Sequence, residues 1–187
     1  MFHSIDSPLM RIRLFSLTVL VCLGTALSAA PETWSEKLTQ NLPLLGHRNW
    51  IVVTDAAYPW QTAPGIETVF ADAELLTVVD RVLAELAKTR HVKPTVYLDS
   101  ELSSVSEKNA PGIGAFRDAL RARLAKQPVI QRPHEQVIAD LDQAGKTFKV
   151  LITKTPLVLP YTSVFFQLDC GYWDAAAEKA LRQAMKP

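Results

Sequence analysis

The sequence has few cysteines, few glycines and no apolar run of membrane-spanning length. Cys22 and Cys170 are its only cysteines. If Cys22 is removed with an export signal, Cys170 remains alone and no intramolecular disulfide can form. The chain has seven glycines, and the segment from Pro111 to Gly114 lacks the following Gly-Lys pair of a phosphate-binding loop. We therefore expect neither a disulfide framework nor a nucleotide-type phosphate site.

The sequence also has no excess of positive or negative charge. Without residues 1–30 the chain keeps 18 basic and 18 acidic residues, and no basic stripe is left that would bind nucleic acid. His47, His91 and His134 lie more than forty residues apart with no cysteine pair or carboxylate cluster beside them, so we expect no metal site. His91 lies in a polar connection and is expected to be solvated, and residues 103–106 are expected to form a plain polar loop.

The first thirty residues have the pattern of an export signal. Arg11 and Arg13 precede an apolar run of about 14 residues, shorter than the roughly 20 that a membrane span needs, and the small residues Ser28-Ala29-Ala30 follow it. We expect cleavage near Ala30, with Met10 as an alternative start. A periplasmic or secreted location follows, with no stable membrane association after cleavage.

The remaining residues, 31–187, have the composition of one globular domain. Hydrophobic residues make up 48% of the chain and charged residues 21%, which is enough apolar surface for a core. No repeat, low-complexity segment or Gly/Ser-rich linker divides it. Strand-like and helix-like segments alternate, which predicts an α/β fold with three αβα layers and a mostly parallel sheet.

The pattern places each element as follows. Strands are expected at 50–54, 67–70, 95–98, 128–130, 148–153 and 163–168, and helices at 33–42, 75–86, 115–125, 134–144 and 174–185, the last as an added C-terminal helix. Thr33 and Glu36 have the spacing of a capping box, and Pro43 is expected to end the first helix. In such sheets ligands bind beyond the carboxyl ends of the strands.

The segment from Leu45 to Pro59 carries the most specific signal. His47 precedes a buried strand and Asp55 follows it, about eight residues later, so about 25 Å of extended chain would separate them. A shared site would need the loop to fold back or a second subunit to contribute. The residues alone favour a helix-capping His and a turn-forming Asp over a shared site.

This segment resembles the amino-terminal signature of the RbsD/FucU family of sugar mutarotases. The resemblance rests on Leu45-Gly46-His47, a polar pair, an apolar strand, Asp55-Ala56 and Pro59. It extends to Phe70-Ala71-Asp72 with Leu75-Leu76 and, more loosely, to Val150–Thr153, Tyr161–Val164 and Gly171. It covers roughly residues 38 to 171 and implies an RbsD-like fold.

The resemblance also implies an activity: interconversion of ring forms or anomers of a free monosaccharide without a cofactor. It assigns His47 as proton donor, Asp55 as sugar ligand, and Tyr161 with its neighbours Thr162 and Ser163 as a contribution from an adjacent subunit of a homo-oligomer. Ser163 stands where the family has Asn.

His134 best matches a further binding position of the family, its alternative being an ordinary residue at a helix start. A histidine with an ordinary pKa of about 6.5 can give or take a proton near neutrality. Tyr58 and Trp60 either stack on the sugar or belong to the core or an interface. An exported monosaccharide-binding or assembly protein that kept the fold without catalysis is the alternative function, so whether the chain is an enzyme stays open.

Overall fold

Residues 50 to 170 build a single six-stranded sheet. The computed structural model describes Met1 and residues 33–185, so the expected export signal lies outside the described residues apart from Met1. The strands are β1 (Trp50–Thr54), β2 (Ile66–Phe70), β3 (Val92–Asp99), β4 (Val129–Arg132), β5 (Val150–Lys154) and β6 (Val164–Cys170). The helices are α1 (Trp34–Asn41), α2 (Leu75–Leu86), α3 (Ile113–Leu124), α4 (His134–Ala144) and α5 (Ala175–Ala184), with short 3-10 turns η1 (Leu42–Leu44) and η2 (Ser100–Ser104).

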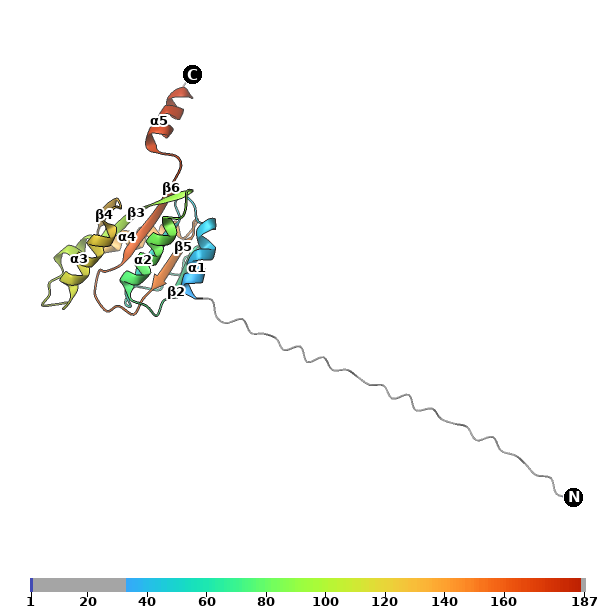
Figure 1. The fold of residues 1–187 in the computed structure, drawn as a ribbon, viewed down its shortest axis with the longest axis horizontal. Helices are drawn as coiled ribbons and strands as arrows, with labels where there is room; N and C mark the ends of the chain where they lie inside the picture. The colour runs from blue at the N-terminus through green and yellow to red at the C-terminus, as the bar shows by residue number, and fades with distance from the viewer. Residues whose placement is uncertain (2–32, 186–187) are drawn as a thin grey trace. The chain divides into compact units, whose positions relative to one another are not determined.

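The sheet is mostly parallel, in the order β2-β5-β1-β6-β3-β4. The β2–β5, β5–β1 and β3–β4 pairs are parallel, whereas β6 runs antiparallel to both of its neighbours, β1 and β3. Five strands therefore share one direction and their carboxyl ends meet at one edge, visible in Figure 1 as the edge opposite α5. The expected α/β fold with a mostly parallel sheet is confirmed.

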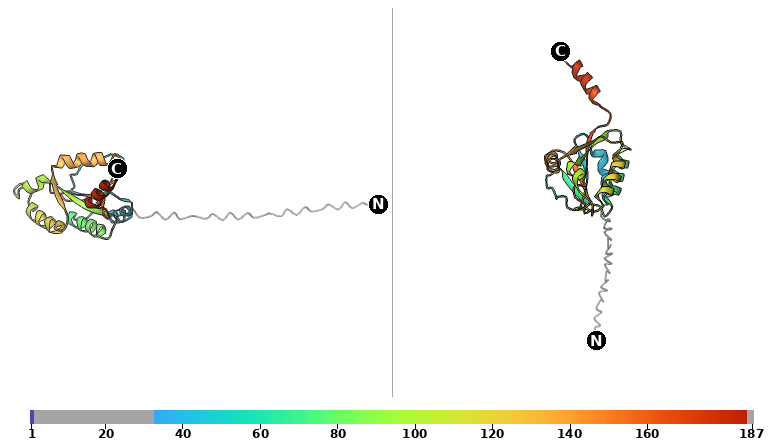
Figure 2. Two further views of the ribbon diagram at one scale, coloured as in Figure 1. Left: turned by 90° about the horizontal axis from the view of Figure 1, so that it is seen from above. Right: turned by 90° about the vertical axis from the view of Figure 1, so that its left-hand side faces the viewer.

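Alternation along each strand divides the core between the two faces of the sheet. In β1, Ile51 and Val53 pack in the larger core cluster, with residues of α1, α2 and α3. Trp50 and Val52 point the other way, into a smaller cluster with residues of α4. Successive side chains of a strand alternate between faces, and here both faces are apolar. Three layers result, with α4 alone on one side of the sheet (Figure 2, left).

Local chemistry explains where several elements begin and end. Thr33 and Glu36 form the expected capping box of α1. The α-helix ends at Asn41, just before Pro43 as expected, and the chain continues as the 3-10 turn η1, where Pro43 lies among the first residues and needs no amide hydrogen.

β3 starts three residues earlier than the pattern indicated and contains Pro94. Pro94 lies opposite Leu168 of β6. The backbone N–H of Leu168 donates to the Asn49 carbonyl, and its C=O accepts from the Arg48 amide, so neither group needs Pro94 as a partner. β4 pairs with β3 only from Val96 onward. The missing amide hydrogen of Pro94 thus leaves no partner unsatisfied on either side.

None of the helices in the described part of the chain is long and apolar enough to cross a membrane. The C-terminal helix α5 is present as expected, capped by Asp174, and none of its residues is buried. It therefore adds little to the core that positions the strand ends.

Candidate functional site

Polar side chains gather at the edge where the parallel strands end. Asp55 directly follows β1, Asp99 is the last residue of β3, and His134 is the first residue of α4. Tyr161 lies in the loop between β5 and β6. This edge is the usual place for a ligand in an open α/β sheet, so it is the candidate site.

Asp55 is held rigidly at this edge. It is 7% exposed; its Oδ1 accepts a hydrogen bond from the Ala57 amide at 2.8 Å, and its Oδ2 accepts one from the Ser163 hydroxyl at 3.3 Å. Ser163 is fully buried. Because each carboxylate oxygen has a second lone pair, Asp55 keeps acceptor capacity for a further hydroxyl, whereas the Ser163 hydroxyl is directed at Asp55.

His134 is fixed from several directions. Its ring Nδ1 lies 2.9 Å from Oδ2 of Asp99, and its backbone N–H donates to both carboxylate oxygens of Glu101, at 3.1 and 3.2 Å. The ring meets Tyr161 edge-on, with centroids 5.4 Å apart, and meets Tyr58 edge-on at 6.3 Å. Within the part of the chain that the structure describes, the second ring nitrogen, Nε2, has no hydrogen-bond partner, so it is available to a ligand.

Tyr161 has a strained backbone. Among the described residues, Arg48 and Tyr161 are the non-glycine residues with positive φ, 73° and 58°. Such conformations cost free energy and tend to be kept at functional sites. The fully buried Thr162 supports the loop, its hydroxyl donating to the Leu159 carbonyl at 2.8 Å. Tyr161 as a whole is 37% exposed.

A cavity of about 660 Å³ opens beside Tyr161 and Glu101. This volume lies within the range of small-molecule sites. Its wall includes Ser104, Ser106 and Asn109. The serine loop that the sequence suggested to be plain therefore lines a cavity that it shares with Tyr161, whereas Asp55, Asp99 and His134 do not line it. The hydroxyls and the amide of this loop suit a ligand with many hydroxyl groups.

The sequence reasoning missed Asp99. Burial raises the pKa of this carboxyl to about 6, with the nearby charges of Glu101 and Asp55 acting in the same direction and the His134 ring opposing them. Burial, followed by the charge of Asp99, also raises the pKa of the Tyr58 hydroxyl. The available signal was positional, since Asp99 ends a parallel strand just as Asp55 follows one.

The two aromatic candidates have different surroundings. Tyr58 is 3% exposed, and its hydroxyl donates to Gln61 at 2.8 Å, so it belongs to the core beneath His134. Trp60 is 81% exposed and is free to contact a ligand or a partner.

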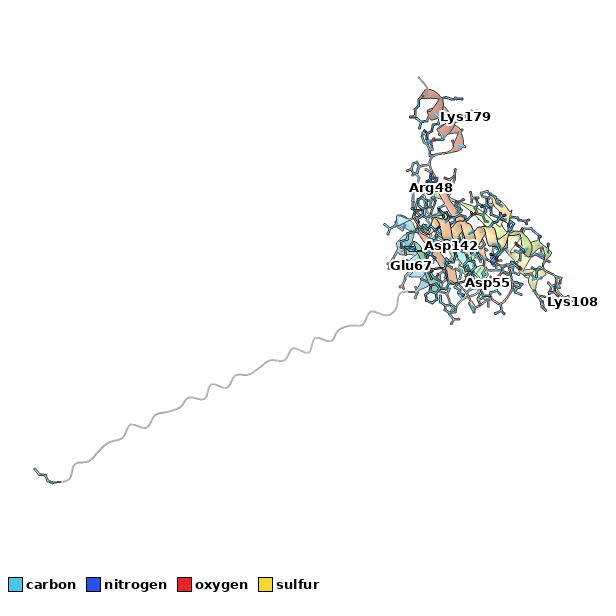
Figure 3. The ribbon with its side chains drawn as sticks, turned by 180° about the vertical axis from the view of Figure 1, so that it is seen from behind. Arg48, Asp55, Glu67, Lys108, Asp142 and Lys179 are labelled. Atoms are coloured by element: carbon cyan, nitrogen blue, oxygen red, sulfur yellow. The ribbon has the colours of Figure 1, made fainter. Side chains whose placement is uncertain are left out.

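His47 lies at the opposite end of β1 from Asp55. Figure 3 labels its neighbour Arg48 at the end of the sheet nearer α5 and Asp55 toward the other. The His47 ring is 56% exposed; its Nδ1 is 2.9 Å from Asp169, and its Nε2 accepts from Nε of Arg48 at 3.0 Å. One copy of the chain thus brings together Asp55, His134, Tyr161 and Ser163, but not His47.

His91 differs from the expectation of a solvated ring. Its Nε2 lies 3.3 and 3.1 Å from the carbonyls of Leu42 and Leu45, so it ties down the segment that leads to His47. Within the described residues, no group of three or more His, Cys, Asp or Glu side chains has a metal-binding arrangement.

Comparison with known proteins supports the fold alone. No family model matches the chain, and no curated protein does. Among solved structures, it is similar to Bacillus subtilis RbsD complexed with D-ribose, with 18% identity and a TM-score of 0.53, covering 71% of this chain and 91% of that one. The fucose mutarotase from Streptococcus pneumoniae, in complex with L-fucose, shares 16% identity over 76% of this chain and 98% of that one, with a TM-score of 0.49. The similarity to RbsD shows that the chain has an RbsD-like fold.

Proposed function

We propose that this protein interconverts ring forms or anomers of a free monosaccharide by acid-base catalysis without a cofactor. One observation carries the proposal: residues assigned by family resemblance from separate segments, Asp55, His134 and Tyr161, meet at the carboxyl edge of the sheet. The structurally similar RbsD was solved with D-ribose, which agrees with a sugar as ligand.

The chemistry needs two proton movements. A base takes the proton of the anomeric hydroxyl while an acid gives a proton to the ring oxygen, so the bond between the anomeric carbon and the ring oxygen breaks and an open-chain carbonyl forms. Ring closure reverses both transfers, from the other face or through another hydroxyl. His134 and Tyr161, whose rings lie 5.4 Å apart, present groups able to exchange protons, and Asp55 accepts hydrogen bonds from sugar hydroxyls.

His47 enters this site, in our proposal, from a second copy of the chain. It lies at the far end of β1 beside a cavity of about 560 Å³ lined also by Arg48, Tyr97 and Arg132. A neighbour that brings its Tyr161 loop to this cavity would place His47 against the sugar. The strained backbone at both Arg48 and Tyr161 is consistent with two functional loops that meet across copies.

A non-catalytic monosaccharide-binding protein is the second candidate, and two contacts favour it. Both ring nitrogens of His47 are already engaged, by Asp169 and Arg48. The Ser163 hydroxyl, at the position where the family has Asn, is directed at Asp55 and buried. Each contact would have to be exchanged before these residues touch a sugar.

Saturation-transfer and line-shape NMR on ribose, fucose and related sugars tests the proposal. Wild-type protein should accelerate ring-form or anomer exchange for at least one sugar, and His47→Ala should lose the acceleration. Sugar binding without acceleration would establish the binding protein instead. Exchange that persists in His47→Ala would remove His47 from the mechanism.

Mixing variants tests the contribution of a second copy. His47→Ala and His134→Ala, each inactive alone, should recover activity when co-expressed, because a mixed oligomer contains sites with both histidines intact. No recovery in a mixed oligomer that is shown to form would contradict a site shared between copies.

Export is a separate proposal, based on the pattern of residues 11–30. We propose a periplasmic or secreted mature chain. Determination of the mature amino terminus after expression in a bacterial host tests it: a terminus near residue 31 in the exported fraction supports export, and full-length protein retained inside the cell opposes it.

A further inference from the structure

Among the described residues, the buried carboxylate of Asp99 has a hydrogen-bond partner for one of its two oxygens only. Its side chain has no exposed surface. One oxygen, Oδ2, lies 2.9 Å from Nδ1 of His134, and the other, Oδ1, has no hydrogen-bond partner among the described residues. Burying an acceptor without a partner costs free energy. The packing of β3 and α4 alone does not require a carboxylate at this position, which points to a role in the site.

The contacts of His134 show what that role is. The helix start is fixed through the backbone N–H, which Glu101 accepts. The ring is confined between Tyr161 and Tyr58, both edge-on. Asp99 is the partner of Nδ1, and the ring is 20% exposed. Since an acceptor at Nδ1 holds the proton there, the remaining nitrogen, Nε2, carries the lone pair of the neutral ring.

We propose that Asp99 is a positioning residue that holds the His134 proton on Nδ1 and turns Nε2 toward the sugar, which makes His134 the base that receives the anomeric proton. This inference rests on the proposed mutarotase function and deepens it, because the resemblance assigned His134 to binding alone. Asp99 itself does not touch the sugar.

The charges around the ring suit this role. Asp99 faces His134 from the end of β3, and Glu101 faces it from η2. The charge of Asp55, at the end of β1, acts on Asp99. Tyr58 lies beneath as a neutral hydroxyl donor to Gln61. When Nε2 takes a proton, the imidazolium that forms lies among carboxylates, and its hydrogen bond to Asp99 becomes charge-assisted.

Nitrogen NMR of the histidine rings tests the geometry independently of activity. In wild-type protein the neutral His134 ring should carry its proton on Nδ1. In Asp99→Ala, which removes the acceptor, and in Asp99→Asn, whose amide can donate to Nδ1, the ring should show a mixture of tautomers or the Nε2-protonated form. A wild-type ring protonated on Nε2, or a tautomer unchanged in both variants, would overturn the inference.

Glu101→Gln is the matched control. It removes a charge two residues from Asp99 while leaving an acceptor for the His134 backbone N–H, so the His134 tautomer should stay as in the wild type. A tautomer change of the same size in this variant would show that any nearby charge sets it, and would contradict a specific role for Asp99.

Exchange kinetics then separate positioning from binding. Asp99→Asn should lower the maximal exchange rate by about 10²-fold, the usual scale of one acid-base group, with KM changed less than about threefold. A loss confined to KM would contradict the inference. If the wild type accelerates no sugar, the mutarotase proposal fails, and the NMR result still decides whether Asp99 orients His134.

Discussion

The burial of Asp99 predicts that Asp99→Asn makes the protein more stable at neutral pH. Burial raises the pKa of this carboxyl from 3.8 to about 6, so the folded state favours the protonated form more than the unfolded state does. A carboxyl of this kind costs stability as the pH rises through the window from about 4 to about 6, and the cost stays in full above it. Replacing it by a neutral amide removes the cost.

The magnitude follows from the two pKa values. At about 1.4 kcal/mol per pKa unit, the change from 3.8 to about 6 corresponds to about 3 kcal/mol above pH 7. Part of this stability cost is already present at about pH 4.5, because the carboxyl is mostly ionised in the unfolded state at that pH. The stability advantage of Asp99→Asn should therefore grow by about 2 kcal/mol between about pH 4.5 and about pH 7.5.

Urea unfolding at these two pH values, followed by tryptophan fluorescence to which the buried Trp50 contributes, measures the stability advantage. Asp118→Asn is the control, since Asp118 is 76% exposed and paired with Arg121 one turn away; its effect should stay within about 0.5 kcal/mol at both pH values. If the stability advantage of Asp99→Asn does not grow with pH, or if the variant is less stable than the wild type at about pH 7.5, burial of Asp99 does not raise its pKa in the folded protein.

Three further changes test the fold. Phe165→Ala removes a fully buried ring from the core beneath α4 and should cost about 3–5 kcal/mol in urea unfolding; a cost below about 1 kcal/mol would contradict the packing. Thr33→Ala removes the cap of α1 and should cost about 1 kcal/mol in thermal unfolding, whereas an unchanged midpoint would show that the cap is not formed. Deletion of residues 172–187 removes α5, which buries no residue, and should change the unfolding free energy by less than about 0.5 kcal/mol; a larger loss would reveal a packed partner.

Local patterns were sufficient to place most elements. The bounds expected for β1, α2 and α4 coincide with those observed, because an unbroken apolar run and helical apolar spacing are local signals. The start of β3 was misplaced because Pro94 reads as a strand breaker. Whether Pro94 is tolerated inside β3 depends on which residues of β6 and β4 lie beside it, and the local sequence does not contain that information.

The candidate site, too, could be predicted from local sequence only in part. Asp55 and His134 were predicted through the resemblance, and the structure brings their segments to one edge. Asp99 was missed because its importance comes from burial and from His134, 35 residues later in the chain. The antiparallel course of β6, which brings Ser163 to Asp55, was likewise not contained in any local pattern.

We propose that the carboxyl edge of the sheet catalyses ring opening of a monosaccharide, and NMR of sugar exchange decides whether it does. Saturation-transfer NMR compares exchange between the ring forms of ribose and fucose with wild-type protein, His134→Ala, and Lys179→Ala on α5 as a distant surface control. Exchange of at least one sugar should be accelerated by the wild type and by Lys179→Ala, and this acceleration should be lost in His134→Ala. Acceleration that survives in His134→Ala, or no acceleration of any sugar by the wild type, would contradict it.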